Sequence, residues 1–381
     1  MRKGWKINTL GDACDMYQPK TISGKEMVAD GEYVVFGANG IIGRYNQFNH
    51  EEPQLLITCR GATCGSVNIS EPKSWITGNA MVVRPKDASI EMRFLEYLFR
   101  GGIDISKAIT GAAQPQITRT NLEPLKISYP ESLPEQQRIV GVLDEAFAGI
   151  ATAKANAEKN RQNARALFES HLHAVFTHRG PGWVEKRLAD VADFKNGLNF
   201  TRQSKGQTLR MVGVGDFQEH SVVPIETLQS VTIDGKLSDD YLIRRDDILT
   251  VRSNGSKDLV GRCMLVPDVD GMTSFSGFII RIRFDTRVVS PRFLLHFMKS
   301  STTRDRLRRD GGGANISNIN QAKLSELPVS LPSFKHQEDI ANRLDDLREE
   351  TQRLEALCER KLAALDALKK SLLHQAFSGQ L

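Results

Sequence analysis

The sequence predicts an α+β protein in which two mixed α/β domains are separated by a long antiparallel two-helix coiled coil. Three observations predict this fold. The first is an internal repeat, and the second is a pair of stretches, residues 136–177 and 335–377, that contain no proline. The third is that short apolar runs bounded by Gly, Asn and Pro, such as "YVVFGANGIIG", precede each of these stretches, as is typical of β-strands.

The repeat is clearest in the two proline-free stretches. "QQRIVGVLDEA" at 136–146 aligns with "QEDIANRLDDL" at 337–347, and the register holds without a gap through "SHLHAVFT" at 170–177 and "SLLHQAFS" at 371–378. Upstream the offset drifts, as between "FLEYLFR" at 94–100 and "FLLHFMK" at 293–299. The chain is therefore one unit duplicated, with two variable domains, two matched helices and a pseudo-twofold axis.

The boundaries follow from this alignment. We expect the first domain at 1–133, a helix at 134–178, the second domain at 179–333 and a second helix at 334–378. The second domain connects the end of the first helix to the start of the second. A parallel pair would make that domain reach back along roughly 60 Å of helix, so we predict an antiparallel pair.

The two helices share a predicted seam of apolar residues spaced in heptads. One seam is rich in leucine and the other in alanine, which lets the helices approach closely. Its expected members are Ile139, Leu143, Ile150 and Leu167 on the first helix, and Ile340, Leu344, Leu347, Leu354, Leu365, Leu368 and Leu372 on the second.

Charge favours a nucleic-acid partner over other classes. The net charge is +5, and residues 183–332 hold 22 Lys and Arg against 18 Asp and Glu, while both helices are nearly balanced. The five cysteines form no paired framework, and no metal site is expected because the cluster of His171, His173 and His178 lacks acidic or Cys partners. No apolar run is long enough for a membrane span and no signal peptide is present, so we expect a cytoplasmic protein.

The motifs of catalysis are absent from the sequence. There is no GxxxxGK[ST] phosphate loop, no Asn-Pro-Pro-aromatic or Asp-Pro-Pro-Tyr run for amino-group methylation, and no convincing nucleophile and base. We therefore predict a protein that is not an enzyme.

Two variable domains alternating with two near-repeated helices resemble the DNA specificity subunits of type I restriction-modification systems. The resemblance covers essentially the whole chain. Its residues are "PEQQRIVGVLDE" and "KHQEDIANRLDD", the helix endings quoted above, and "GWKINTLGD" with "GWVEKRLAD" at the two domain starts. "GANGIIG", "CRGATCG" and "VRSNGSKDLVGR" also resemble segments of that family's target-recognition domains. The second copy has Lys335 and His336 where the first has Pro and Glu.

The resemblance implies a non-catalytic subunit that binds double-stranded DNA. Each domain would read one half of a bipartite target, while the helices space the domains and hold two methyltransferase subunits. No cofactor would bind this chain. S-adenosylmethionine would belong to the methyltransferase, and ATP and Mg to a restriction subunit, if one is present.

Candidate DNA contacts come from polar loops and one arginine cluster. "KSSTTRDRLRRDGGG" at 299–313 places Lys299 and four arginines against Asp305, before a glycine loop and "ANISNIN". Arginines suit phosphates and guanine edges, and such loops let backbone amides approach phosphates. A solvated helix end and ordinary hairpin turns are the competing interpretations. The candidates are Asn39, Arg44, Arg60, Gln114, Gln116, Arg119, Arg252, Asn254, Lys257, Arg304, Arg308, Arg309 and Asn315.

Two other functions fit parts of the pattern. One is a coiled-coil adaptor with two protein-binding domains, which the basic second domain disfavours. The other is a stand-alone DNA methyltransferase or nuclease, which the missing motifs disfavour.

Overall fold

The computed structural model describes residues 4–201, 203–218, 220–256, 258–309 and 318–381. It divides into two compact units, residues 1–158 with 359–381 and residues 159–358. Each unit combines one β-rich domain with one part of each of two long helices, so the predicted α+β class is confirmed.

The first unit contains three small sheets. Strand β1 pairs with β9, so that Trp5 lies opposite Pro130, and the other two sheets have the strand orders β2-β8-β5-β6 and β4-β3-β7. The strands are β1 (Trp5–Thr9), β2 (Cys14–Tyr17), β3 (Tyr33–Gly37), β4 (Gly40–Tyr45), β5 (Leu55–Thr58), β6 (Val67–Ile69), β7 (Trp75–Ile76), β8 (Ala80–Pro85) and β9 (Lys126–Pro130). The short helices are α1 (Leu10–Ala13), α2 (Met92–Tyr97) and α3 (Arg119–Leu122).

The second unit repeats this topology. Strand β10 pairs with β18, and the other sheets have the orders β11-β17-β14-β15 and β13-β12-β16, in which β12 and β16 are parallel, as β3 and β7 are in the first unit. The strands are β10 (Val184–Arg187), β11 (Ala192–Asn196), β12 (Thr208–Val212), β13 (Ser230–Thr232), β14 (Ile248–Val251), β15 (Cys263–Leu265), β16 (Thr273–Phe275), β17 (Ile279–Phe284) and β18 (Pro328–Leu331). The short helices are α5 (Pro291–Lys299), α6 (Ser301–Arg309) and α7 (Gln321–Ser325).

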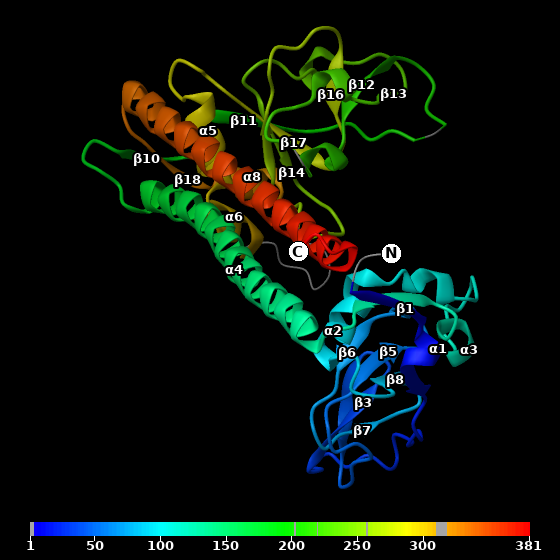
Figure 1. The fold of residues 1–381 in the computed structure, drawn as a ribbon. Coiled ribbons are helices and arrows are strands. Elements are labelled where there is room, and N and C mark those ends of the chain that lie inside the picture. Colours follow the sequence, from blue (N-terminus) through cyan, green and yellow to red (C-terminus); the bar gives the residue numbers. More distant parts are fainter. Residues whose placement is uncertain (1–3, 202, 219, 257, 310–317) are drawn as a thin grey trace. The chain divides into compact units, whose positions relative to one another are not determined.

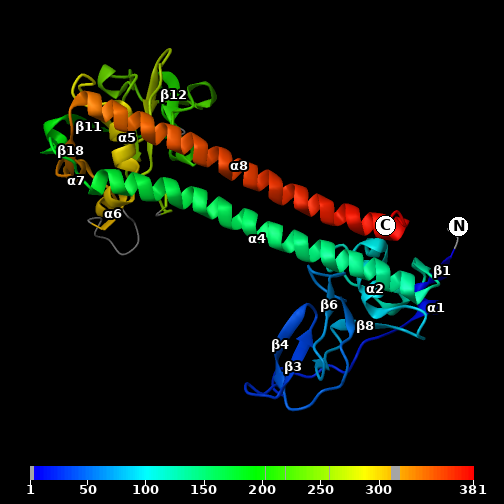
Figure 2. The same ribbon diagram turned by 60° about the vertical axis from the view of Figure 1, so that its left-hand side comes forward.

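The long helices are α4 (Leu133–Thr177) and α8 (Phe334–Ser378), of 45 residues each. They lie side by side and antiparallel (Figures 1 and 2). Within the first unit the Lys154 ammonium lies 2.8 Å from Oδ1 of Asp366, and within the second unit Arg165 pairs with Glu355. The residue number thus rises along α4 while it falls along α8, as an antiparallel pair requires.

Burial along the helices agrees with most of the predicted seam, since five of its eleven residues are buried and three are half-buried. Leu143, Ile150 and Leu344 are buried, as are Ile139 and Ile340, while Leu347, Leu365 and Leu372 are half-buried. By contrast, Leu167, Leu354 and Leu368 are 54%, 47% and 46% exposed.

The difference has a clear physical reason. Away from the first turns of the helices, as after Ala164 and Thr351, the second seam residue of a heptad lies four positions after the first, where the prediction placed it three positions after. Phe168 is therefore buried in place of Leu167, and the Glu355 side chain in place of Leu354 is only 21% exposed. These positions are filled by an aromatic ring and an ion pair, and the neighbouring leucines point outward.

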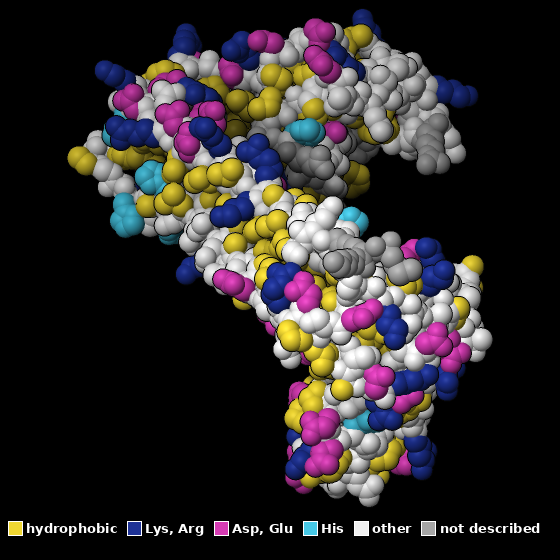
Figure 3. Space-filling view, in the orientation of Figure 1, with side chains coloured by type: hydrophobic (Ala, Val, Ile, Leu, Met, Phe, Trp, Pro, Cys, Tyr) yellow, Lys and Arg dark blue, Asp and Glu magenta, His cyan; other side chains and the backbone are white. Residues whose placement is uncertain are grey.

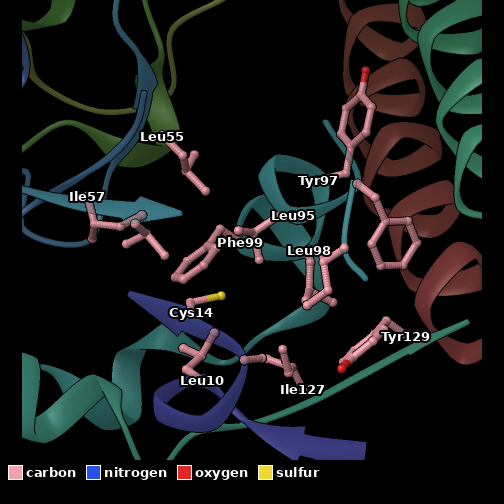
Figure 4. Packing of buried hydrophobic residues seen from close by; sticks show 14 of the residues in the cluster. Leu10, Cys14, Leu55, Ile57, Leu95, Tyr97, Leu98, Phe99, Ile127 and Tyr129 are labelled. Carbon is pink, nitrogen blue, oxygen red and sulfur yellow. The ribbon is translucent and has the colours of Figure 1, made fainter. Parts of the chain in front are cut away.

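Each domain packs its four-stranded sheet and a short helix against the long helices. In the first unit, Leu10 and Cys14 meet Leu95, Leu98 and Phe99 across a continuous apolar core (Figure 4). Leu143 of α4 and Leu373 of α8 join the same core. A fully buried leucine contributes about 2 kcal/mol, so this contact ties the helices firmly to the domain.

Two adjacent glycines bring the end of α8 close to the turn Leu98–Gly102. A Cβ atom on Gly101 would lie 2.8 Å from the Leu373 side chain, and one on Gly102 would lie 2.6 Å from the ring of Phe377. Side chains at these positions would push α8 away, so the close packing depends on glycine.

Candidate nucleic-acid interface

In each unit, a polar loop beyond a central strand is joined to the segment that precedes the last strand. In the first unit, Arg60 forms a β-bridge with Gln116, and the Gly61 amide donates to the carbonyl of Pro115 at 3.1 Å. In the second unit, Ser253 forms the corresponding bridge with Asn318. Residues far apart in sequence thus form one polar surface in each domain.

Matching hydrogen bonds align the two loops residue by residue. The carbonyl of Cys59 accepts from the amide of Ile117, and the carbonyl of Arg252 accepts from the amide of Ile319. Arg252 therefore occupies the position of Cys59, and Arg60 that of Ser253. The two arginines thus lie at successive positions of the repeated loop, each in its own domain.

Among the first-domain candidates, the structure brings together Arg60, Gln114 and Gln116, all of which are exposed. Asn39 lies in the turn between β3 and β4, where its Oδ1 accepts from the side-chain amide of Asn68 at 2.9 Å.

Two further candidates have internal partners. Arg44 on β4 donates to the carbonyls of Gly31 and Glu32 at 2.5 and 2.8 Å, and Arg119 at the start of α3 donates to the carboxylate of Glu123 at 2.6 Å. The Arg44 bonds hold the segment before β3, and the Arg119 bond lies within its own short helix. Only part of each guanidinium is therefore left for another ligand.

Among the second-domain candidates, Arg252 is half-buried, and its Nε has no hydrogen-bond acceptor among the described residues. A buried donor without an acceptor costs about 1–3 kcal/mol, so the site suits a ligand that supplies one. The side-chain oxygen of Asn254 accepts from the Ser256 amide at 3.0 Å and shapes the loop.

The arginine cluster is described only in part. Arg304 lies within α6 and lines a cavity with Lys299. The side chains of Arg308 and Arg309, and the whole of Lys257 and Asn315, lie outside the described residues.

Sequence reasoning missed one feature, which is the convergence of Arg262 and Arg348 on the same cavity. These residues come from separate elements, so no spacing in the sequence could reveal it. In the described ranges, no group of three or more His, Cys, Asp or Glu residues could hold a metal ion. No helix in the described part of the chain is long and apolar enough to cross a membrane.

Comparison with known proteins gives the class of this fold and surface. Residues 2–160 and 181–361 match the family model of the type I restriction modification DNA specificity domain. The two matched segments cover most of the chain and correspond to its two copies. The chain belongs to this family.

Individual relatives agree with that assignment. The chain is 26% identical over 358 residues to the type I restriction enzyme StySPI specificity subunit of Salmonella potsdam, covering 91% of this chain and 73% of the relative. It is 22% identical over 404 residues to the EcoDI specificity subunit of Escherichia coli, covering 99% of this chain and 88% of the relative.

Solved structures show the same fold. A chain from a structural study of complex assembly and conformational transition of the type I R-M system matches with a TM-score of 0.78 at 17% identity, covering 100% of this chain and 99% of that one. The HsdS subunit of Thermoanaerobacter tengcongensis matches with a TM-score of 0.64 at 17% identity, covering 99% and 97%. The protein is the DNA target specificity subunit of a type I restriction-modification system and is itself non-catalytic.

Proposed function

We propose that each β-rich domain reads one half of a bipartite DNA target and that the two long helices set the distance between the halves. The observation that carries this proposal is the repeated topology, which presents a bridged polar loop in each domain: residues 60–61 with 115–116, and residue 253 with 318. Two similar readers on one chain suit a target of two separate parts. The loops differ in sequence, so the halves differ in bases.

The helices also hold two methyltransferase subunits in this proposal. Leu167 and Leu368 occupy equivalent positions of the repeat, and both are about half exposed. A helix position that faces only water does not need an apolar side chain, so these leucines fit a protein contact. Hydrophobic side chains reach the surface over α4 and α8 (Figure 3). A surface that is repeated by pseudo-symmetry fits two copies of one partner.

Cofactors follow from these partners. S-adenosylmethionine would bind the methyltransferase subunits, and ATP with Mg would bind a restriction subunit where the complex has one. This chain would contribute the DNA sequence preference to both activities.

Half-site specificity tests the proposal. Arg60→Ala and Arg252→Ala should each relax the base preference in one half of the target only and weaken binding roughly 10- to 100-fold, which is the usual loss for one arginine contact. Arg245→Ala is the matched control, because Arg245 is exposed and pairs with Asp268 at 2.7 Å. Selection from a random DNA library by the purified complex gives the preference of each variant.

Two results would contradict the proposal. One is a relaxed preference in both halves from a single substitution. The other is a complex that binds its protein partners but no DNA, which would favour an adaptor instead.

A further inference from the structure

The second unit contains a cavity of about 250 Å³ whose lining is strongly basic. Phe168 and Leu172 of α4 form its apolar wall. Among the described residues of its polar lining, four guanidinium or ammonium groups face one carboxylate, that of the exposed Glu169. The cations are Arg262, Lys299, Arg304 and Arg348, with His220 beside them.

Neutral groups hold two of these cations in place. Arg262 donates to the carbonyls of Phe217 and Gln218 at 3.1 and 3.0 Å. The guanidinium of Arg348 lies 5.3 Å from the centre of the Phe168 ring and donates to the Ser221 hydroxyl at 3.4 Å.

Three of the cations, Arg262, Lys299 and Arg348, have no direct contact with a carboxylate in the described part of the chain. Among the described residues, no acceptor forms a hydrogen bond with the Lys299 ammonium. The charge of Asp345 acts on Lys299 and raises its pKa, but the Asp345 carboxylate is itself bound by Arg292 and His296 at 3.0 and 2.7 Å.

The repeat supplies an internal comparison. The equivalent cavity of the first unit is lined by Arg100, which aligns with Lys299, and by Lys369 and Leu373, which align with Phe168 and Leu172. There, Arg100 donates to the buried carboxylate of Glu96 at 2.8 Å.

The second unit lacks that carboxylate, because Leu295 occupies the position of Glu96. Burial, and then the neighbouring Arg348, lower the pKa of Lys299 to about 8. Burial and the charge of Arg348 thus disfavour protonated Lys299, and a bound anion would stabilise it.

We propose that this cavity binds an oxyanion, namely a phosphate group. Guanidinium and ammonium donors converge on one small space, and they form short charge-assisted hydrogen bonds to phosphate oxygens. The phosphate group comes either from a DNA backbone or from a free phosphate compound. The proposal that the cavity binds phosphate does not depend on the proposed DNA recognition. Only the assignment of the phosphate to a DNA backbone rests on that proposed function.

Calorimetric titration of the full chain with inorganic phosphate and with pyrophosphate, at constant ionic strength in chloride, tests the site. We expect binding at one site, weakened about tenfold or more by Lys299→Met, since one charge-assisted hydrogen bond is lost. Lys299→Arg keeps the charge and should retain binding. Lys369→Met changes the equivalent cavity and should bind phosphate as the unaltered chain does.

Absence of phosphate binding by the unaltered chain, or equal binding by Lys299→Met, overturns the proposal. A second arm then identifies the source through the salt dependence of DNA binding. If a DNA phosphate occupies the cavity, Lys299→Met makes the fall of log K for DNA binding with log salt less steep by about 0.9, and free phosphate competes with DNA. If the source is a free phosphate compound, the slope stays unchanged. A chain that binds phosphate, but whose complex with its protein partners binds no DNA, would contradict the proposed function and leave the phosphate site intact.

Discussion

Two buried glutamines attach the domains to the long helices, one in each copy of the repeat. The side-chain oxygen of Gln136 accepts from the Glu91 amide at 2.8 Å, and its nitrogen donates to the carbonyls of Ser89 and Pro130, both at 2.8 Å. Gln337 makes the same three bonds, from the Ser290 amide and to the carbonyls of residues 288 and 332. One side chain thus satisfies three backbone groups where the chain enters each helix.

Gln136→Ala and Gln337→Ala should each lower the free energy of unfolding of their own unit by about 3 kcal/mol or more, because three backbone groups lose their partner. Gln352→Ala, at an exposed position of α8, should change stability by less than about 0.5 kcal/mol. Urea denaturation followed by circular dichroism measures the difference. A loss below about 1 kcal/mol at both glutamines would show that water or other groups replace them.

Substitution of glycine by alanine should have opposite effects at two positions. Gly141 of α4 has open space around its Cβ position, so Gly141→Ala should stabilise the protein by about 0.5–1 kcal/mol through helix propensity. Gly102→Ala should destabilise it, because the added Cβ meets Phe377 and Leu98 at under 3 Å. Thermal unfolding of the two variants should shift in opposite directions, and a stabilising Gly102→Ala would contradict the close packing at the end of α8.

For individual residues, the sequence did not reveal which polar side chains are buried or which residues from other elements lie beside them. The repeat aligns Gln136 with Gln337, but nothing in the alignment tells a buried polar side chain from an exposed one. The same limit applies to the cavity around Lys299, whose cations come from α5, α6, α8 and the strand region near Arg262. Such sites depend on tertiary neighbours, which a spacing rule does not include.

At the scale of elements, each domain is held to its long helix by a matched polar cluster. Arg93 of α2 and the hydroxyl of Tyr97 both bind Asp144 of α4. The second unit repeats the arrangement: Arg292 and His296 of α5 both bind Asp345 of α8. Two donors on a short helix and one carboxylate on a long helix fix the angle between them in both copies.

The paired helices and their direction could be predicted because two proline-free repeats flank one domain. The side of the seam could not. The predicted heptad spacing placed Leu167 and Leu354 in the seam. In the structure Phe168, whose ring contacts Arg348, is buried instead, and Glu355, which pairs with Arg165, is half-buried. A hydrophobic pattern does not indicate contacts in which a charged side chain packs on a ring or pairs with another charge.

The outward leucines predict how many partners bind. Leu167→Glu and Leu368→Glu should each remove one methyltransferase subunit from the complex, and the double variant should remove both, since a charge in an apolar contact is strongly unfavourable. Leu167→Met and Leu368→Met keep an apolar side chain of similar volume and should retain both subunits. Native mass spectrometry counts the subunits. Two subunits on the double glutamate variant would remove these leucines from the docking surface.

At the scale of the whole molecule, duplication explains why one chain carries two readers. Strand order, parallel pairs, bridged loops, buried glutamines and polar clusters all occur twice. Sequence alignment could predict the duplication because the helices keep their register. It could not predict the sheets, since the offset drifts where loops of different length join short strands.

If the helices set the distance between two DNA half-sites, the preferred spacer length should change with the length of the helices. One heptad can be removed from each helix, residues 158–164 and 356–362. This excision keeps the pairs Lys154–Asp366 and Arg165–Glu355 and keeps the seam in register. Each helix becomes about 10 Å shorter, which equals about 3 base pairs of DNA. A control chain carries the same two heptads replaced by sequences of equal length.

The measurement is selection by the complex from a DNA library in which the two half-sites are separated by spacers of every length. The shortened protein should prefer a spacer about 3 base pairs shorter than the original. Its affinity should fall, because that change also rotates one half-site by roughly 100° around the duplex. The control chain should keep the original spacer. An unchanged spacer preference with full affinity in the shortened protein would contradict the account.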